Sequence, residues 1–149
     1  MIINRPGLTD FATGSSDPSG QSGAMCWRMN RGQVQVLLIT SRETGRWVIP
    51  KGWPQDGKSA AGSAAAEAWE EAGVEGTLKE TPLGIYSYGK VLKPGVVQPC
   101  IVTVFALRVA RLRDKFPERS ERRRKWFDAT RAARMTSRSI PVATRQLED

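Results

Sequence analysis

The chain has no histidine among its 149 residues and only two cysteines. Mechanisms and metal sites built on histidine are therefore excluded, and acid–base chemistry falls to carboxylates, lysine, tyrosine or water. Cys26 and Cys100 both lie in apolar, strand-like runs, so we interpret them as small buried residues rather than as a disulfide or a metal site. The sequence also lacks an apolar run long enough to span a membrane and a signal-peptide pattern. We expect a cytoplasmic protein with no membrane partner.

Acidic residues are in the minority. The chain carries 23 Lys and Arg against 15 Asp and Glu, which gives a formal net charge of +8. Such an excess favours anionic partners: nucleotides, polyphosphates or nucleic acid.

The length suits one domain with one core, and no internal repeat is present. Residues 1–20 hold little apolar side chain and several Pro, Gly and Ser, so we expect a flexible arm there and one domain over residues 21–149.

The apolar pattern predicts interleaved strands and helices without a strict alternation. Strands are expected over residues 24–29, 33–40, 47–49, 81–91 and 98–110, with brief pairing at 77–79 and a short strand around Trp126 and Phe127. Helices are expected in a central stretch that ends at Gly73, then over residues 128–135 and 142–147. The pattern therefore indicates the α+β class.

Residues 51–74 run from a short strand through a Gly-rich loop into the central helix. Glu67, Glu70 and Glu71 fall within an arc of roughly 100° on that helix. The opposite arc carries Ala61, Ala65, Ala68 and Ala72, small residues that would let the helix lie close to a sheet. Like charges at this spacing destabilise a helix by about 0.2–0.5 kcal/mol per pair. A solvated acidic face is one explanation of the cluster, and a divalent cation held by carboxylate oxygens is the other.

This stretch resembles the Nudix box, whose pattern is G-x5-E-x7-R-E-U-x-E-E-x-G-U with U aliphatic. The matching positions are Gly52, Glu67, Ala68, Glu70, Glu71, Gly73 and Val74. Two positions depart from the pattern, because Lys58 stands at the first Glu and Ala66 stands at the Arg. In the family that Arg helps to hold the catalytic carboxylates. The resemblance therefore implies that another cation holds them here or that turnover is slow.

The resemblance also implies a Nudix-type α/β/α sandwich with a mixed β-sheet, which uses Mg²⁺ or Mn²⁺. Glu67, Glu71 and Glu70 would be the metal ligands, and the main-chain carbonyl of Lys51 or Gly52 would complete the shell. Glu70 would also act as the base or orient the attacking water. The implied reaction is the hydrolysis of a diphosphate linkage, X–P–O–P.

Segments outside the box indicate one branch of the family. A basic run over residues 111–125, then Trp126, Phe127 and a helix, resembles the diphosphoinositol polyphosphate and diadenosine polyphosphate phosphohydrolases. Residues 47–50, which lead into the box, and residues 84–86 after it also resemble that branch. The implied partner is a small-molecule nucleoside or inositol polyphosphate, in agreement with the basic excess.

Several residues are candidate phosphate contacts. Arg42 and Arg46 flank the expected site, and a guanidinium suits a bidentate grip on phosphate, although charge for solubility explains each equally well. The candidate substrate-binding residues are Arg42, Arg46, Lys51, Gly52, Lys58 and Arg124. The basic run that contains Arg124 is otherwise typical of a solvated loop.

Three alternatives stay open. Residues 52–59 also satisfy the P-loop pattern G-x-x-x-x-G-K-S, but Pro54 has no N–H to offer a phosphate and the three Glu residues would be unexplained. A Nudix-fold module could instead bind nucleotide, polyphosphate or RNA without useful activity. RNA 5′-end pyrophosphohydrolysis is the third, which the basic run allows although no aromatic-interleaved RNA motif accompanies it. No pattern indicates an oligomeric state.

Overall fold

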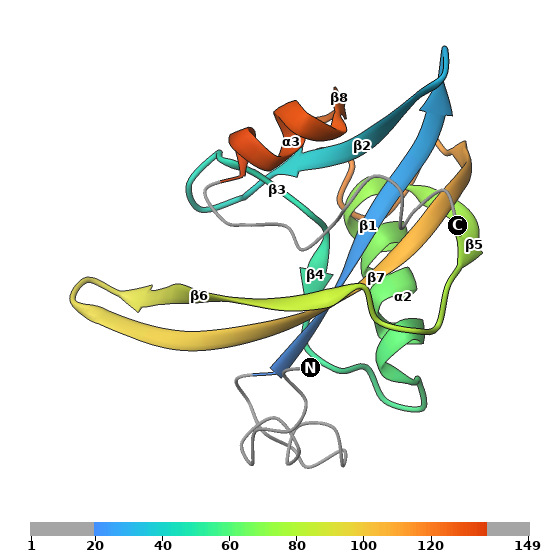
Figure 1. Cartoon of the computed structure of the whole chain (residues 1–149). Helices are drawn as coiled ribbons and strands as arrows, with labels where there is room; N and C mark the ends of the chain where they lie inside the picture. Colours follow the sequence, from blue (N-terminus) through green and yellow to red (C-terminus); the bar gives the residue numbers. More distant parts are fainter. Residues whose placement is uncertain (1–19, 137–149) are drawn as a thin grey trace.

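The computed structural model describes residues 20–136 of the chain (Figure 1). The flexible arm expected over residues 1–20 and the helix expected over residues 142–147 lie outside the described residues, apart from Gly20. Gly20 does not belong to an arm, because it starts the first strand and pairs with Ile101. Among the helices that are described, none has the length and apolar character needed to cross a bilayer.

Within residues 20–136 the chain forms eight strands and two helices. The strands are β1 (Gly20–Asn30), β2 (Gln33–Thr40), β3 (Trp47–Val48), β4 (Lys51–Gly52), β5 (Val74–Leu78), β6 (Gly84–Lys93), β7 (Val96–Leu112) and β8 (Arg124–Asp128), and the helices are α2 (Ala60–Ala72) and α3 (Ala129–Met135). The elements that were expected within the described residues are present, with shifted ends. The largest shift is at β1, which begins at Gly20 instead of at residue 24.

All eight described strands belong to one sheet. Its path runs β3-β2-β1-β7-β5, while β4 pairs with β1, β6 with β7 and β8 with β2. β1 and β7 are parallel, and the other strand pairs are antiparallel. The sheet is therefore mixed, as expected. Arg31 and Gly32 join β1 to β2 with positive φ angles of 54° and 79°, the backbone conformation of a tight two-residue hairpin turn.

Each face of the sheet carries a buried core cluster, and one helix packs against each cluster. On β1, Ala24 and Cys26 belong to the core cluster beneath α2, whereas Met25 and Trp27 belong to the cluster that includes Ala132 of α3. This alternation follows from the two-residue period of a strand. Figure 1 shows α2 and α3 at separate places on the sheet. The α/β/α sandwich is thus confirmed, and both cysteines are free and buried.

Local signals at its two ends fix the length of α2. The Ser59 side chain accepts a hydrogen bond from the Gly62 N–H at the start, and Gly73 ends the helix in the left-handed region at φ 69°. Ala61, Ala64, Ala68 and Ala72 pack on the sheet. The expectation named Ala65 instead of Ala64, so the helix is rotated relative to it. This rotation turns Glu67 and Glu71 toward the interior.

The segment between β7 and β8 is pinned to the end of α2. The main-chain N–H of Arg113 donates to the Gly73 carbonyl at 2.8 Å, and that of Glu118 donates to the Glu70 carbonyl at 3.0 Å. The expectation of a solvated loop therefore holds for only part of this basic segment.

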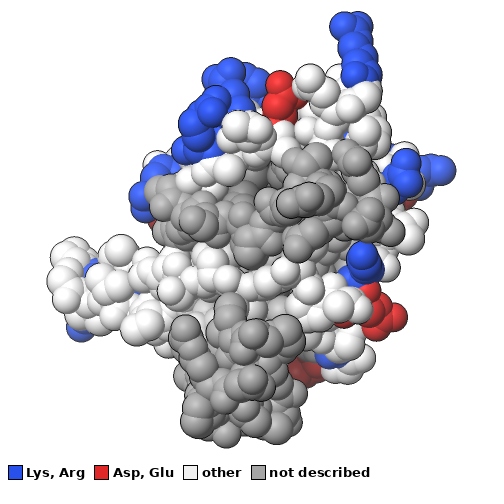
Figure 2. Space-filling view, in the orientation of Figure 1, with Lys and Arg blue, Asp and Glu red and all other residues white. Residues whose placement is uncertain are grey.

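Figure 2 shows that Lys and Arg outnumber acidic residues on the displayed face, mainly toward the end that carries α3 and the β1–β2 turn.

Candidate active site

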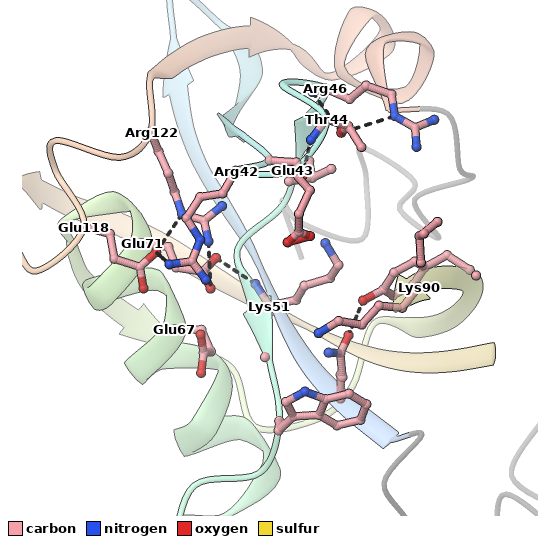
Figure 3. Close-up of a pocket in the computed structure, with 18 residues that line it drawn as sticks. Arg42, Glu43, Thr44, Arg46, Lys51, Glu67, Glu71, Lys90, Glu118 and Arg122 are labelled. Atoms are coloured by element: carbon pink, nitrogen blue, oxygen red, sulfur yellow. Dashed lines mark hydrogen bonds and ion pairs between the residues drawn. The ribbon is translucent and has the colours of Figure 1, made fainter. Parts of the chain in front are cut away.

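A cavity of about 640 Å³ lies between α2, the loop of residues 41–46, β4 and β6 (Figure 3). Its charged lining residues are Arg42, Arg46, Lys51, Lys90 and Arg122 on the cationic side and Glu43, Glu67, Glu71 and Glu118 on the acidic side. Strands, a helix and two loops therefore each bring a charged side chain to one hollow. Figure 3 shows the labelled basic side chains on one side of Glu67 and Glu71, with Arg46 farthest from them in the view.

Glu67 and Glu71 are one helical turn apart on α2, and their exposed fractions are only 8% and 7%. Glu67 lies against Gly52 of β4 so closely that a Cβ atom at residue 52 would overlap its carboxylate. Glu71 accepts a hydrogen bond from the Lys51 main-chain N–H at 3.3 Å. The two carboxylates are therefore held against β4, and a solvated acidic face does not describe them.

The pKa of Glu71 is raised to about 8, mainly by burial and also by a hydrogen bond with Glu67. Arg122 opposes both effects by favouring the charged form. When two buried carboxylates lie this close, a negative charge on one disfavours ionisation of the other, and a cation stabilises both charges. The electrostatics therefore favour either a proton or a metal ion between the two side chains.

Arg122 contacts two of the acidic residues that line the cavity, Glu71 and Glu118. Its Nη2 lies 3.7 Å from Oε2 of Glu71, and its Nε donates to Oε1 of Glu118 at 2.8 Å. Its Nη1 donates to the Thr40 carbonyl at 3.1 Å. Arg42 extends the network outward, because its Nη1 donates to Oε1 of Glu121 at 2.8 Å and lies 4.0 Å from Glu118.

Gln55 joins the acidic side chains at the other end. Its Nε2 donates to Oε2 of Glu67 at 2.8 Å and to Oε2 of Glu70 at 3.3 Å. Its main-chain N–H donates to the Ser63 hydroxyl at 3.0 Å, and Ser63 is fully buried. The loop before α2 therefore carries a fixed amide group that faces two of the three box carboxylates.

The structure brings six of the nine predicted site residues to the cavity: Arg42, Arg46, Lys51, Gly52, Glu67 and Glu71. Glu70, Lys58 and Arg124 do not line it. Glu70 is held beside it by Gln55, and Lys58 is exposed in the loop before α2. Arg124 lies at the end of α2, where its Nη1 donates to the Ala72 carbonyl at 2.6 Å.

Sequence reasoning missed Arg122, Glu118, Lys90 and Gln55. One signal was available, because Glu118 and Arg122 stand four residues apart with opposite charge, a spacing typical of an ion pair. Nothing local to Lys90 or Gln55 distinguishes them from other polar surface residues. Their roles depend on where β6 and the loop before α2 meet the cavity.

The donor set fits a hard divalent cation. Within residues 20–136, no group of three His, Cys, Asp or Glu side chains is placed to hold a metal ion. Mg²⁺ typically takes one or two carboxylates and fills its shell with water and substrate phosphates, so Glu67 and Glu71 suffice as protein side chains. The Glu67 carboxylate lies against Gly52, which is also the first glycine of the P-loop pattern.

Comparison with known proteins gives concordant matches. The chain matches the NUDIX domain model over residues 20–146. It is 30% identical to "Nudix hydrolase 12, mitochondrial" of Arabidopsis thaliana over 125 residues, which are 78% of this chain and 62% of that protein. It is 29% identical to "Diphosphoinositol polyphosphate phosphohydrolase 3-alpha" of Mus musculus over 141 residues, 91% of this chain and 82% of that protein. The chain thus spans less than two thirds of the plant relative.

A solved structure supports the same fold. The C. elegans Ap4A hydrolase superposes with a TM-score of 0.59 at 18% identity, covering 87% of this chain and 91% of the other. One of these relatives, the mouse protein, is named as a diphosphoinositol polyphosphate phosphohydrolase, which is the branch that the segments outside the box indicate. Because the domain match covers most of the sequence and the sheet and helices agree with it, the chain belongs to the Nudix family.

Proposed function

We propose that this chain hydrolyses diphosphate linkages in nucleoside or inositol polyphosphates, such as diadenosine polyphosphates, with Mg²⁺ or Mn²⁺. One observation carries the proposal. The buried carboxylates of Glu67 and Glu71 face the same cavity as the cationic side chains of Arg42, Lys51 and Lys90. Such a hollow suits a cation and a polyphosphate together.

Glu67 and Glu71 would hold the metal ion, with the main-chain carbonyl of Lys51 or Gly52 as a further oxygen ligand. When bound, the ion would neutralise charge on the diphosphate and lower the pKa of water. The substrate phosphates would lie against Arg42, Arg46 and Lys51. Lys58 and Arg124 are the weaker members of the proposed set, because neither lines the cavity.

Hydrolysis forms a bond from a water oxygen to one phosphorus and breaks the bond from that phosphorus to the bridging oxygen. The water proton passes to a carboxylate, and the family resemblance assigns this role to Glu70. Glu70 shares the Gln55 amide with Glu67, which keeps it next to the metal-binding pair. Negative charge that develops on the leaving phosphate would be offset by Arg42 and Lys51.

The names of the relatives support a polyphosphate substrate, since one is a diphosphoinositol polyphosphate phosphohydrolase and a solved structure is an Ap4A hydrolase. The excess of cationic over acidic residues across the chain agrees with such a substrate. The cytoplasmic location stays a prediction, and the plant relative is named mitochondrial.

The test is a screen of phosphate release from dinucleoside polyphosphates, inositol pyrophosphates, nucleotide sugars and 5′-triphosphate RNA, with and without Mn²⁺. We expect metal-dependent release from the first two classes. Glu70→Gln should lower kcat by about 10²-fold or more, whereas Glu80→Gln, at an exposed position outside the cavity, should stay within about twofold of the wild type. An undiminished rate for Glu70→Gln would remove Glu70 from the mechanism.

A Nudix-fold binding module is the second candidate, and Ala66 at the box Arg position is the observation that favours it. Such a module would bind a polyphosphate tightly but release no phosphate with either metal. Preferential release from 5′-triphosphate RNA would instead support the RNA 5′-end alternative.

A further inference from the structure

Ala66 leaves the two buried carboxylates without the arginine that the box pattern provides. The side chain of Ala66 ends at its Cβ atom, so it offers no hydrogen-bond donor to Glu67 or Glu71. Two carboxylates that are each less than one tenth exposed need donors or cations to fix their orientation. The structure supplies such groups from outside the box helix.

Arg122 has the geometry of a fixed donor rather than of a mobile surface cation. Its side chain is only 9% exposed, and each of its three guanidinium nitrogens has an oxygen partner: Glu71, Glu118 or the Thr40 carbonyl. The planar guanidinium loses little freedom per bond once its plane is set. Arg122 therefore fixes the side of Glu71 that faces away from β4.

Gln55 is fixed from its own main chain. Its N–H donates to the Ser63 hydroxyl, and its carbonyl accepts from the Lys58 N–H at 3.1 Å. The amide group then reaches the carboxylates of Glu67 and Glu70. A donor anchored in this way orients the Glu67 carboxylate from the loop side, as Gly52 does from the β4 side by contact.

We propose that Arg122 and Gln55 are positioning residues that hold Glu71 and Glu67 in place of the missing box arginine. The proposal rests on the proposed function, because it assigns the two carboxylates to metal binding. Partners that orient metal ligands typically change metal affinity or activity by about 10–100-fold when they are removed. Neither residue belongs to the box, and the two act from opposite ends of the carboxylate pair.

The variants are Arg122→Met and Gln55→Met, with Arg123→Met and Gln33→Met as matched controls. Arg123 is exposed and stacks over the Trp47 ring, and Gln33 is exposed at the β1–β2 turn; neither lines the cavity. Mn²⁺ affinity would be measured without substrate by electron paramagnetic resonance of free Mn²⁺. We expect affinity to fall about 10-fold or more for both test variants and to stay within about twofold for the controls.

Kinetics then separate positioning from substrate contact. At saturating Mn²⁺ we expect kcat to fall with little change in KM. Arg122→Lys keeps the charge but loses the planar fork, so it should recover part of the Mn²⁺ affinity. A raised KM with unchanged Mn²⁺ affinity in Arg122→Met would make Arg122 a substrate contact and overturn its positioning role.

Folding is checked by circular dichroism, and if Arg122→Met fails to fold, Arg122→Lys and Gln55→Met carry the test. Unchanged Mn²⁺ affinity in those two variants would overturn the proposal. Absence of Mn²⁺ binding by the wild type would instead overturn the proposed function itself, so the two failures are distinguishable.

Discussion

The carboxylate of Glu67 lies against the α-carbon of Gly52, with no room between them for a side chain. Gly52 cannot easily withdraw, because β4 pairs it with Ser22 of β1. Glu67 in turn is buried and bonded to Gln55. This contact links the box glycine to the orientation of a candidate metal ligand.

Gly52→Ala should therefore displace the Glu67 carboxylate and lower both Mn²⁺ affinity and kcat, by about tenfold or more. The matched control is Gly62→Ala, in the first turn of α2, where the added methyl meets only the Ser59 hydroxyl and the Lys58 side chain. That control should keep activity within about twofold, because neither Ser59 nor Lys58 lines the cavity. Equal activity of both variants would contradict the steric role of Gly52.

Stability of the metal-free protein should fall as the pH rises. Burial raises the pKa of Glu71 from 4.5 to about 8, so between these values the folded protein keeps a proton that the unfolded chain has lost. The free energy of unfolding then decreases with pH, by at most about 1.4 kcal/mol per unit for this group. Urea unfolding with a chelator between pH 5 and 8 measures the slope.

Glu71→Gln should flatten that slope, whereas exposed Glu80→Gln should leave it unchanged. Mg²⁺ should stabilise the protein more at pH 8 than at pH 5, because the ion and the proton compete for the same carboxylates. A slope that is the same for the wild type and Glu71→Gln would show that another group controls the pH dependence.

Arg124 should act on stability more than on substrate binding. Its Nη1 donates to the Ala72 carbonyl at 2.6 Å, where the last carbonyls of α2 need partners. Arg124→Met should lower the free energy of unfolding by about 1–2 kcal/mol and leave KM nearly unchanged. Exposed Lys125→Met is the control and should change neither quantity appreciably. A raised KM with unaltered stability would restore Arg124 as a substrate contact.

Restoring the box arginine should make Arg122 less necessary. Residue 66 precedes Glu67 and stands one helical turn before Glu70, so a guanidinium there reaches the same acidic cluster. Ala66→Arg should raise Mn²⁺ affinity. In the Ala66→Arg background, Arg122→Met should lower Mn²⁺ affinity by a smaller factor than it does in the wild type. A double-mutant cycle on Mn²⁺ affinity should give a coupling energy of about 0.5–3 kcal/mol. Strictly additive effects on Mn²⁺ affinity would contradict the idea that Arg122 and an arginine at residue 66 position the same carboxylates.

Local signals explain why so much of the fold and site was predictable. Ser59 and Gly73 mark the two ends of α2 through capping chemistry that is readable from residue type. The apolar runs of β2 and β7 needed no tertiary information. The box spacing also identified Glu67 and Glu71 before their burial was known, because helical periodicity places them on one face.

The remaining features depend on contacts between distant segments. Arg122 was hidden in a basic run, and its contact with Glu71 exists only because β8 pairs with β2 and brings that run across the end of α2. The rotation of α2 that buries Ala64 instead of Ala65 is likewise set by the sheet beneath it. Composition indicates neither arrangement.

The parallel pairing of β1 with β7 has a consequence for biosynthesis. Residues 20–27 must wait for residues 101–108 before the hydrogen bonds between these two strands can form. At about 5–20 residues per second on the ribosome, this delay is on the order of ten seconds. During it, an apolar strand can pair with β2 but has its other edge open. We therefore expect nascent chains stalled before residue 101 to engage chaperones, and truncations at that point to aggregate.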